Sequence, residues 1–245
     1  KQTQLSIGAG TVFSVEHLAK EMALIDNAHG VRSRLRIDPN AMIINESHKL
    51  QELAAAMDQH IGSTVHGCGA ALAEKIWRNG ARLARDVGEL GEFMPDANGG
   101  MLNSQIKIRG FRRVSQLINA HGLMNEAVML EGTQGTLLSL DHTPHYPFCT
   151  SRNVTATGVA AECGVPMAAV RDVILVLRTL PIRVGGNSGP TGGRELTWGE
   201  VSERAGIPVE EFTTVTKKRR RIFEFDWDEV QYAVMLNSPT QIVLT

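Results

Sequence analysis

Apolar residues recur at helical spacing near the start of the chain. Leu18, Met22 and Ile25 follow one another every three or four positions within residues 14–28. This period places the three side chains on one face of a helix. Ser14 stands at the N-cap position, where its hydroxyl can accept a hydrogen bond from the first turn. The pattern therefore predicts an amphipathic helix over this stretch.

Spacing and capping patterns predict further helices and strands along the rest of the chain. Further helices are predicted around Leu50, Leu53 and Met57, over residues 70–87 and 115–120, from Pro166 onward, from the capping-box pair Thr197 and Glu200, and from Asp226 through Met235. Strands are predicted over residues 41–44, 127–130, 173–177 with Ile182 and Val184, and 241–245. The runs at 127–130 and 173–177 are continuously apolar, so we expect both strands to be buried on both faces.

Strands that alternate with helices are typical of an α/β fold with a largely parallel central sheet flanked by helices. The chain has 245 residues, of which 42% are hydrophobic, and this is enough to bury one substantial core. We therefore predict a single α/β domain over residues 1–245.

Charge and cysteine content limit the class of protein. The 25 Lys and Arg residues nearly balance the 26 Asp and Glu residues, so no global positive field favours nucleic acid. Cys68, Cys149 and Cys163 follow no metal-binding spacing, which indicates reduced thiols and a cytoplasmic protein. No apolar run approaches the ~20 residues of a membrane span, and the first residues lack the apolar core of a signal peptide.

A polar turn with two glycines follows the apolar run at 127–130. In the turn Glu131-Gly-Thr-Gln-Gly-Thr136, the glycines let the backbone bend and let a ligand approach Gln134 closely. Ligands of parallel sheets bind beyond the carboxyl ends of the strands, and the Gln134 amide offers one donor and one acceptor group to a polar ring. The alternative is an ordinary turn after a strand.

Other polar residues have both functional and ordinary interpretations. Ser63 and Thr64 precede a predicted helix, where they could bind an anion or simply cap the helix. Lys217-Lys-Arg-Arg-Arg221 could bind carboxylates, act as a nuclear localisation cluster or be a solvated charge run. His142 and His145 could suggest a metal pair, but no further ligands complete it, and we predict no metal site from them.

Four segments in order carry a family resemblance. They are Ile61-Gly-Ser-Thr-Val-His-Gly-Cys-Gly69, Glu131 to Asn153, Pro181-Ile-Arg-Val-Gly185 and Thr213 to Arg221. Together they resemble the adenylosuccinate synthetase family over nearly the whole chain. The resemblance implies an α/β fold related to P-loop NTPases. It also implies a carbon–nitrogen ligase that joins L-aspartate to IMP with hydrolysis of GTP, using Mg²⁺.

The resemblance also assigns roles to individual residues. Ser63, Thr64, Arg78, Gln134, Thr150 and Lys218 match positions that bind the substrate nucleotide, and Gln134 is the expected catalytic residue. The matching aspartate loop comprises Thr213, Thr214, Val215, Thr216, Lys217, Lys218, Arg219 and Arg220, and Arg220 is also expected to contact the triphosphate. Lys218 replaces a family arginine, so a point charge stands where a planar fork is usual. The arginine that matches Arg78 crosses to the partner subunit's site, which implies a homodimer.

Several expectations remain open at this point. The family's phosphate loop and its acid–base residues lie upstream of residue 1, so we expect a fragment truncated at both ends, inactive by itself. Three segments look closer to a phage-type branch that joins aspartate to dGMP, namely Ser151-Arg-Asn153, Gly185-Gly-Asn-Ser-Gly-Pro190 and Thr213-Thr-Val-Thr-Lys217. The triphosphate could be GTP or ATP. A non-catalytic nucleotide-binding relative is a further alternative.

Overall fold

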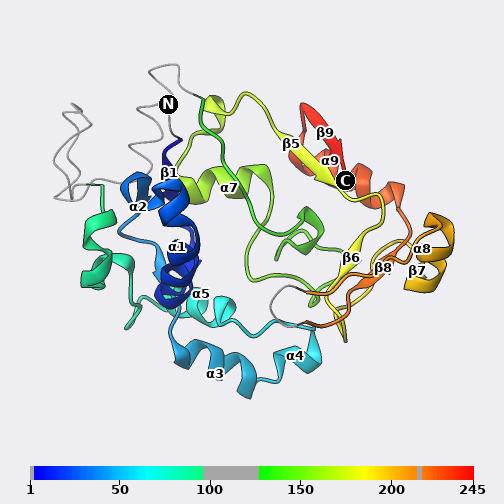
Figure 1. Cartoon of the computed structure of the whole chain (residues 1–245), viewed down its shortest axis with the longest axis horizontal. Helices are drawn as coiled ribbons and strands as arrows, with labels where there is room; N and C mark the ends of the chain where they lie inside the picture. The colour runs from blue at the N-terminus through cyan, green and yellow to red at the C-terminus, as the bar shows by residue number, and fades with distance from the viewer. Residues whose placement is uncertain (1–2, 96–126, 214–216) are drawn as a thin grey trace. The chain divides into compact units, whose positions relative to one another are not determined.

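The computed structural model describes residues 3–95, 127–213 and 217–245 (Figure 1). These residues form two compact units. The first unit comprises Lys1–Gln51, Gly67–Glu131 and Gly158–Val170. The second unit comprises Glu52–His66, Gly132–Thr157 and Arg171–Thr245.

The first unit combines short parallel strands with helices. Its elements are β1 (Leu5–Ile7), β2 (Val12–Phe13), α1 (Val15–His29), α2 (Val31–Arg34), β3 (Leu35–Ile37), β4 (Met42–Ile43), α5 (Cys68–Trp77) and the 3₁₀ turns η1 (Ala84–Asp86), η2 (Gly88–Phe93) and η4 (Met167–Ala169). Two further helices, α3 (Glu46–Ala54) and α7 (Ala156–Cys163), cross the boundary between the units. β1 pairs with β3 and β2 with β4, both parallel.

Apolar packing holds the first unit together. The core cluster contains Met22, Leu35, Ile37, Ala41, Ile43, Ala84, Val87, Leu90 and Phe93. α1 contributes through part of the face that its spacing predicts, with Met22 in the cluster and Leu18 packed against it, whereas Ile25 is exposed. The predicted cap is confirmed, since Ser14 Oγ accepts from His17 N at 3.4 Å. Gly30 ends the helix in the left-handed conformation, with φ of 56°.

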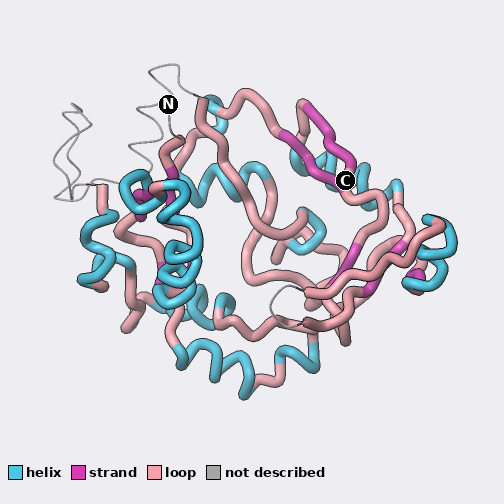
Figure 2. The backbone as a smooth tube through the Cα atoms, in the orientation of Figure 1, coloured by secondary structure: helices cyan, strands magenta, loops and turns pink. Residues whose placement is uncertain are grey.

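The second unit consists of short elements separated by long loops (Figure 2). Its elements are α4 (Met57–His60), η3 (Thr136–Leu138), β5 (Ile174–Leu177), β6 (Ile182–Arg183), β7 (Glu195–Leu196), α8 (Trp198–Ala205), β8 (Arg221–Phe223), α9 (Trp227–Asn237) and β9 (Gln241–Leu244). β5 and β9 are parallel, whereas β6, β8 and β7 form an antiparallel sheet. A small cluster of Leu196, Trp198, Val201 and Ile222 packs between α8 and this sheet.

Helix caps in the second unit follow the sequence closely. The capping box at α8 is confirmed: Glu200 N donates to Thr197 Oγ1 at 3.1 Å, and Thr197 N donates to Glu200 Oε2 at 2.7 Å. The Thr197 backbone N–H, together with Arg194, lowers the pKa of Glu200 to about 2. Asp226 caps α9, because its side chain accepts from Glu229 N at 2.8 Å.

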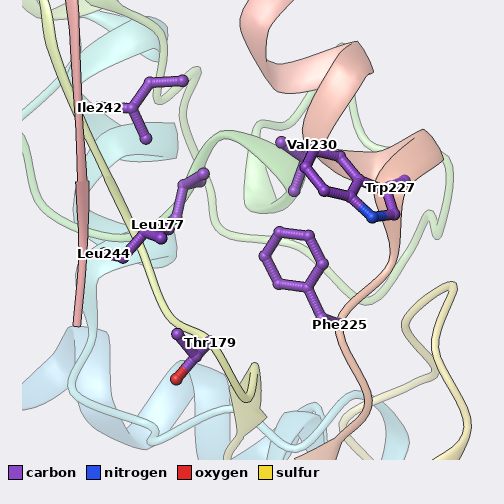
Figure 3. A pocket seen from close by; sticks show the side chains of 7 residues that line it. All are labelled: Leu177, Thr179, Phe225, Trp227, Val230, Ile242 and Leu244. Carbon is purple, nitrogen blue, oxygen red and sulfur yellow. The ribbon is translucent and has the colours of Figure 1, made fainter.

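An apolar hollow lies between β5, β9 and the start of α9 (Figure 3). It is lined by Leu177, Thr179, Phe225, Trp227, Val230, Ile242 and Leu244. The rings of Phe225 and Trp227 meet edge to face, with centroids 5.2 Å apart. None of the site residues predicted from the sequence lines this hollow, and its apolar walls do not suit a nucleotide phosphate.

The α/β fold class is confirmed, but three local predictions were wrong. Residues 127–130 form no strand, and Met129 is 83% exposed, because no described strand pairs with this run. The helix predicted over 70–87 ends at Trp77, where Arg78 turns into the left-handed region. The single buried strand predicted after residue 173 is two short strands with partly exposed faces.

Three other predictions concern the helix from Pro166, the helix over 115–120 and the number of domains. Pro166 precedes a 3₁₀ turn in place of an α-helix. The helix predicted over 115–120 lies outside the described residues. The assignment of residues 1–245 to one domain stays a prediction.

Candidate functional site

The 185–190 turn, which follows β6, is the structural centre of the candidate site in the second unit. Gly186 and Gly189 adopt φ of 89° and 79°, a region that glycine enters without steric strain. Inside the turn, Ser188 N donates to Gly186 O at 2.9 Å, and Ser188 Oγ donates to Val184 O at 2.5 Å. Three loops that contain predicted site residues pack directly against this turn.

The loop that contains Ser63 and Thr64 contacts one side of the 185–190 turn. Asn187 Nδ2 donates to His60 O at 2.9 Å. Gly62 packs so closely that a Cβ there would lie 2.9 Å from Ser188 Cα. Ser63 Oγ accepts from Val65 N at 3.1 Å, so the ordinary loop hydrogen bond is present and the hydroxyl proton is left to donate.

The loop that contains Thr150 contacts the same turn through Phe148. A Cβ on Gly189 would lie 2.3 Å from Cγ of the Phe148 ring, so only glycine fits beneath this ring. Arg183 Nη1 donates to Phe148 O at 3.2 Å and also to Ser188 O. The Phe148 backbone and ring are therefore both held by the turn and by the strand that precedes it.

The segment that follows Gln134 is hydrogen-bonded to the Thr150 loop and to α9. Thr150 N donates to Leu138 O at 2.8 Å, four residues after Gln134. Thr136 Oγ1 accepts from Asn237 Nδ2 at 2.9 Å, and both of these side chains are buried. Gln134 itself is exposed with φ of 71°. The amide is therefore presented to solvent on a turn that is anchored from beneath.

The segment from Thr213 to Arg220 is held by hydrogen bonds between Thr213 and Lys218, and it contacts the turn through Arg219. Thr213 N donates to Lys218 O, and Lys218 N donates to Thr213 Oγ1, both at 2.9 Å. A Cβ on Gly185 would lie 2.2 Å from Arg219 O, so the two backbones touch. Residues 214–216 lie outside the described residues.

The basic side chains of this segment differ in their surroundings. Lys217, Lys218 and Arg219 are exposed, and Arg219 forms an ion pair with Glu210. Arg220 Nε lies 3.5 Å from Glu211 Oε2 without making a hydrogen bond. Lys217 has φ of 51°. Cations on a short closed loop can pair with the carboxylates of a small acidic ligand.

Known proteins resemble this chain over nearly its whole length. The family model described as adenylosuccinate synthetase matches residues 1–95 and 101–245. This chain belongs to the adenylosuccinate synthetase family. The adenylosuccinate synthetase of Methanocaldococcus jannaschii is 36% identical over 249 residues, which cover all of this chain and 64% of that protein. The chain thus spans a little under two thirds of the length of this relative.

A phage protein and two solved structures are also similar to this member of the adenylosuccinate synthetase family. The N6-succino-2-amino-2'-deoxyadenylate synthase of Vibrio phage phiVC8 is 33% identical, over 98% of this chain and 66% of its own. The cyanophage S-2L succinoaminodeoxyadenylate synthetase, solved with dGMP and dATP, superposes with a TM-score of 0.73 at 29% identity and covers 98% of this chain and 65% of its own. The fully ligated adenylosuccinate synthetase of Plasmodium falciparum gives 0.75 at 25%, covering 98% and 61%.

Arg78, the remaining predicted contact of this adenylosuccinate synthetase family member, lies in the first unit. It ends α5 with φ of 59°, and its backbone N–H donates to Glu74 O and Lys75 O, both at 3.2 Å. The side chain is exposed. Exposure is compatible with the expected reach into a partner subunit, which stays a prediction.

Two arginines beside the 185–190 turn have contrasting partners. Arg221 binds Glu195 with two hydrogen bonds of 2.8 and 2.6 Å, and this hydrogen bonding raises the pKa of Arg221 and lowers that of Glu195. Arg183 is buried with no ion pair to a described carboxylate. Burial lowers the pKa of its guanidinium, while the charge of Glu229 opposes that shift. Arg183 lies in the family segment Pro181-Ile-Arg-Val-Gly185 but is not among the site residues predicted from the sequence.

The described side chains do not assemble a site for the expected metal ion. Among them, no group of three or more His, Cys, Asp or Glu residues is gathered as a metal site. His145 Nε2 lies 2.8 Å from Glu229 Oε1, and His142 O accepts from the hydroxyl of Tyr232. The described residues therefore do not fit Mg²⁺ by themselves.

No helix in the described part of the chain is long and apolar enough to cross a membrane.

Proposed function

We propose that the gene product is a carbon–nitrogen ligase that joins L-aspartate to IMP, with hydrolysis of GTP. The observation that carries this proposal is the convergence of three loops on the 185–190 turn. These loops bring hydroxyl groups and cations into one unit, and the segment after Gln134 is hydrogen-bonded to the Thr150 loop. Membership of the adenylosuccinate synthetase family supports the same assignment.

Each side chain has a role that its chemistry suits. Thr64 and Thr150, assisted by Ser63, donate hydrogen bonds to the nucleotide phosphate. The Gln134 amide contacts the purine, with one donor and one acceptor group directed to the ring edge. Gln134 is exposed on a turn that Thr136 and Asn237 anchor, so it can meet the base without reorganisation of the loop beneath it.

The 213–220 loop binds aspartate in this proposal. Lys217, Lys218 and Arg219 are exposed cations, and the substrate has two carboxylates. Lys218 presents one ammonium in place of an arginine fork, so we expect looser control of carboxylate geometry than an arginine would give. Arg220 contacts the triphosphate, for which its loose pairing with Glu211 leaves donors available.

The overall reaction replaces the purine O6 with the amino nitrogen of aspartate. The family's route first makes O6 a good leaving group by phosphoryl transfer, and the amine then displaces phosphate. The side chains of this unit position the reactants and neutralise charge, which requires no reactive nucleophile. Mg²⁺ and GTP or ATP are the proposed cofactors, and a cytoplasmic homodimer with Arg78 at the partner site is the proposed assembly. We propose no role in nucleic-acid binding.

A second candidate acceptor is dGMP. The phage relative is named as a 2-amino-2'-deoxyadenylate synthase, and the similar cyanophage enzyme was solved with dGMP. The reaction class is unchanged, because in both cases the purine oxygen is replaced by the aspartate amine. Only the purine substituent and the sugar differ between the two acceptors.

The test is consumption of aspartate by the full-length gene product with Mg²⁺ and a triphosphate. IMP and dGMP are supplied separately, each with GTP and with ATP, and omission of the acceptor is the control. Turnover with one acceptor would establish the ligase and identify its branch. No turnover with either acceptor, in a protein that is folded and binds the monophosphate, would favour a non-catalytic nucleotide-binding relative.

A further inference from the structure

Arg183 connects two of the loops that meet at the candidate site. It is only 9% exposed, and its Nη1 donates to the carbonyl oxygens of both Phe148 and Ser188. Phe148 lies two residues before Thr150, and Ser188 lies within the 185–190 turn. One buried guanidinium nitrogen therefore bridges the Thr150 loop to the turn.

The charge of Arg183 lacks a direct counter-ion among the described residues. Glu229 is the carboxylate whose charge acts on it, but Glu229 Oε1 accepts from Gly192 N at 2.8 Å and lies 2.8 Å from His145 Nε2. Arg221 also contacts the turn, where its Nη1 donates to Gly189 O at 2.6 Å, but its charge is paired with Glu195. The other guanidinium nitrogens of Arg183 make no hydrogen bond to a described residue.

We propose that Arg183 is a positioning residue of the nucleotide-phosphate site, which holds the Thr150 loop on the 185–190 turn and supplies a buried positive charge for the phosphate. The inference rests on the proposed function, because it concerns the phosphate of the same nucleotide. It adds a residue that the sequence motifs did not select.

The physical reason is the unfavourable burial of an unpaired charge. A guanidinium that is removed from water without an adjacent anion is destabilising, and an incoming anion relieves that penalty. In a region of low dielectric constant, the attraction between the guanidinium and a phosphate is stronger than it would be at the surface. A phosphate beside Thr150 would supply this anion, whereas a nucleoside without a phosphate would not.

A purely structural role for Arg183 makes a different prediction. If the side chain only brackets two carbonyl groups, its loss would loosen both loops and weaken nucleoside and nucleotide binding alike. If its charge also serves the phosphate, its loss would weaken nucleotide binding selectively. The ratio of the two dissociation constants separates these cases.

The experiment measures the binding of the monophosphate and of its nucleoside to the full-length gene product by calorimetry. Arg183→Gln keeps a donor group but removes the charge, and Arg183→Lys keeps the charge. Arg204→Gln is the matched control, because Arg204 is an exposed arginine of the same unit whose ion pair with Glu224 is long, at 3.5 Å.

We expect Arg183→Gln to lower the nucleotide-to-nucleoside affinity ratio by about tenfold or more, the size of one charge-assisted contact. Arg183→Lys should retain most of the ratio, and Arg204→Gln should leave it unchanged. An unchanged ratio in a folded Arg183→Gln variant would overturn the inference. Wild-type protein that binds neither the monophosphate nor aspartate would overturn the proposed function instead.

A second measurement applies if Arg183→Gln does not fold. Hydrogen exchange of the wild-type amides in segments 147–151 and 185–190 is followed with the monophosphate and with the nucleoside. The inference expects the monophosphate to protect both segments together and the nucleoside to protect neither. Protection of only one segment, or equal protection by both ligands, would contradict it.

Discussion

The two units differ in what holds them together. Among the described residues, nine buried apolar side chains form the core cluster of the first unit, whereas four form that of the second. The buried polar and charged side chains of the second unit include Thr136, Ser139, Thr155, Arg183, Ser188, Thr213 and Asn237. The first unit is therefore stabilised mainly by apolar burial, and the second mainly by hydrogen bonds between loops.

Close backbone contacts extend this difference. In the second unit, Gly62, Gly185 and Gly189 each leave no room for a Cβ atom against another loop. Side chains that contact a polar substrate must themselves be polar and must be held in place. Short loops fixed by hydrogen bonds can present such side chains in fixed positions. We therefore expect damage to the first unit to lower stability, and damage to the second unit to lower activity.

The largest effect is expected from Gln134→Ala. Loss of the amide that we propose contacts the purine should lower kcat/KM by about two to three orders of magnitude, as loss of a preorganised donor does elsewhere. Because Gln134 is exposed, the unfolding midpoint should change little. Steady-state kinetics and urea unfolding of Gln134→Ala and of Gln231→Ala, an exposed glutamine on α9, provide the comparison. An unchanged rate would remove Gln134 from the site.

Ile37→Ala should have the opposite profile. Ile37 is fully buried in the first unit, and its truncation should lower the free energy of unfolding by about 2–5 kcal/mol. The KM for the nucleotide should stay at the wild-type value at a temperature where the variant is folded. If KM rose in proportion to the loss of stability, the division of roles between the units would be wrong.

The paired variants Gly189→Ala and Gly186→Ala separate contact from backbone strain. Both residues have positive φ, but only Gly189 would place its Cβ against the Phe148 ring, since nothing lies within 4 Å of a Cβ on Gly186. Gly186→Ala should cost about 1 kcal/mol of stability, and Gly189→Ala about 1–3 kcal/mol more. Only Gly189→Ala should also raise the nucleotide KM. Equal effects on stability and KM would show that the Phe148 contact is unimportant.

The smallest effect concerns the pH dependence of Glu200. Its pKa in the folded protein is lowered from 4.5 to about 2, so its stabilising contribution is complete above pH 4.5 and is lost as the pH falls toward 2. Glu200→Gln should therefore melt below wild type at pH 7, and the gap should narrow progressively in acid. Thermal melts between pH 7 and pH 3 would detect this change. A gap that stayed constant over that range would contradict the assignment.

Local features of the sequence predicted the fold better than long-range ones. The caps at Ser14, Thr197 and Asp226 depend on residues within three positions, and all three N-cap hydrogen bonds formed. The capping box predicted for Asp226 and Glu229 formed only in part, because the Glu229 carboxylate bonds Gly192 N instead of the Asp226 backbone. The strand predicted over 127–130 needed a distant partner, which no apolar run can specify alone. The helix after residue 70 ended early because Arg78 took a left-handed conformation, next to the turn-forming pair Asn79-Gly80 that the prediction passed over.

The candidate site residues stay a prediction, and the same limit applies to them. Thr64, Gln134 and Thr150 stand out in the sequence because they lie in segments that match family motifs. The residues that support them do not stand out: Asn237 bonds Thr136 from 101 positions away. Arg183 occurs in a short motif, but its role depends on carbonyl groups of Phe148 and Ser188, which only the folded chain brings near.

Three proposed functional residues, Arg78, Gln134 and Lys217, occupy the left-handed backbone region, at φ of 59°, 71° and 51°. A side chain in this region costs about 1–2 kcal/mol relative to glycine. Glycine at any of the three positions would therefore relieve strain while deleting the functional group. Directed evolution for heat resistance alone would favour such replacements and lower the proposed activity, so thermostability libraries of this protein should also be screened for turnover.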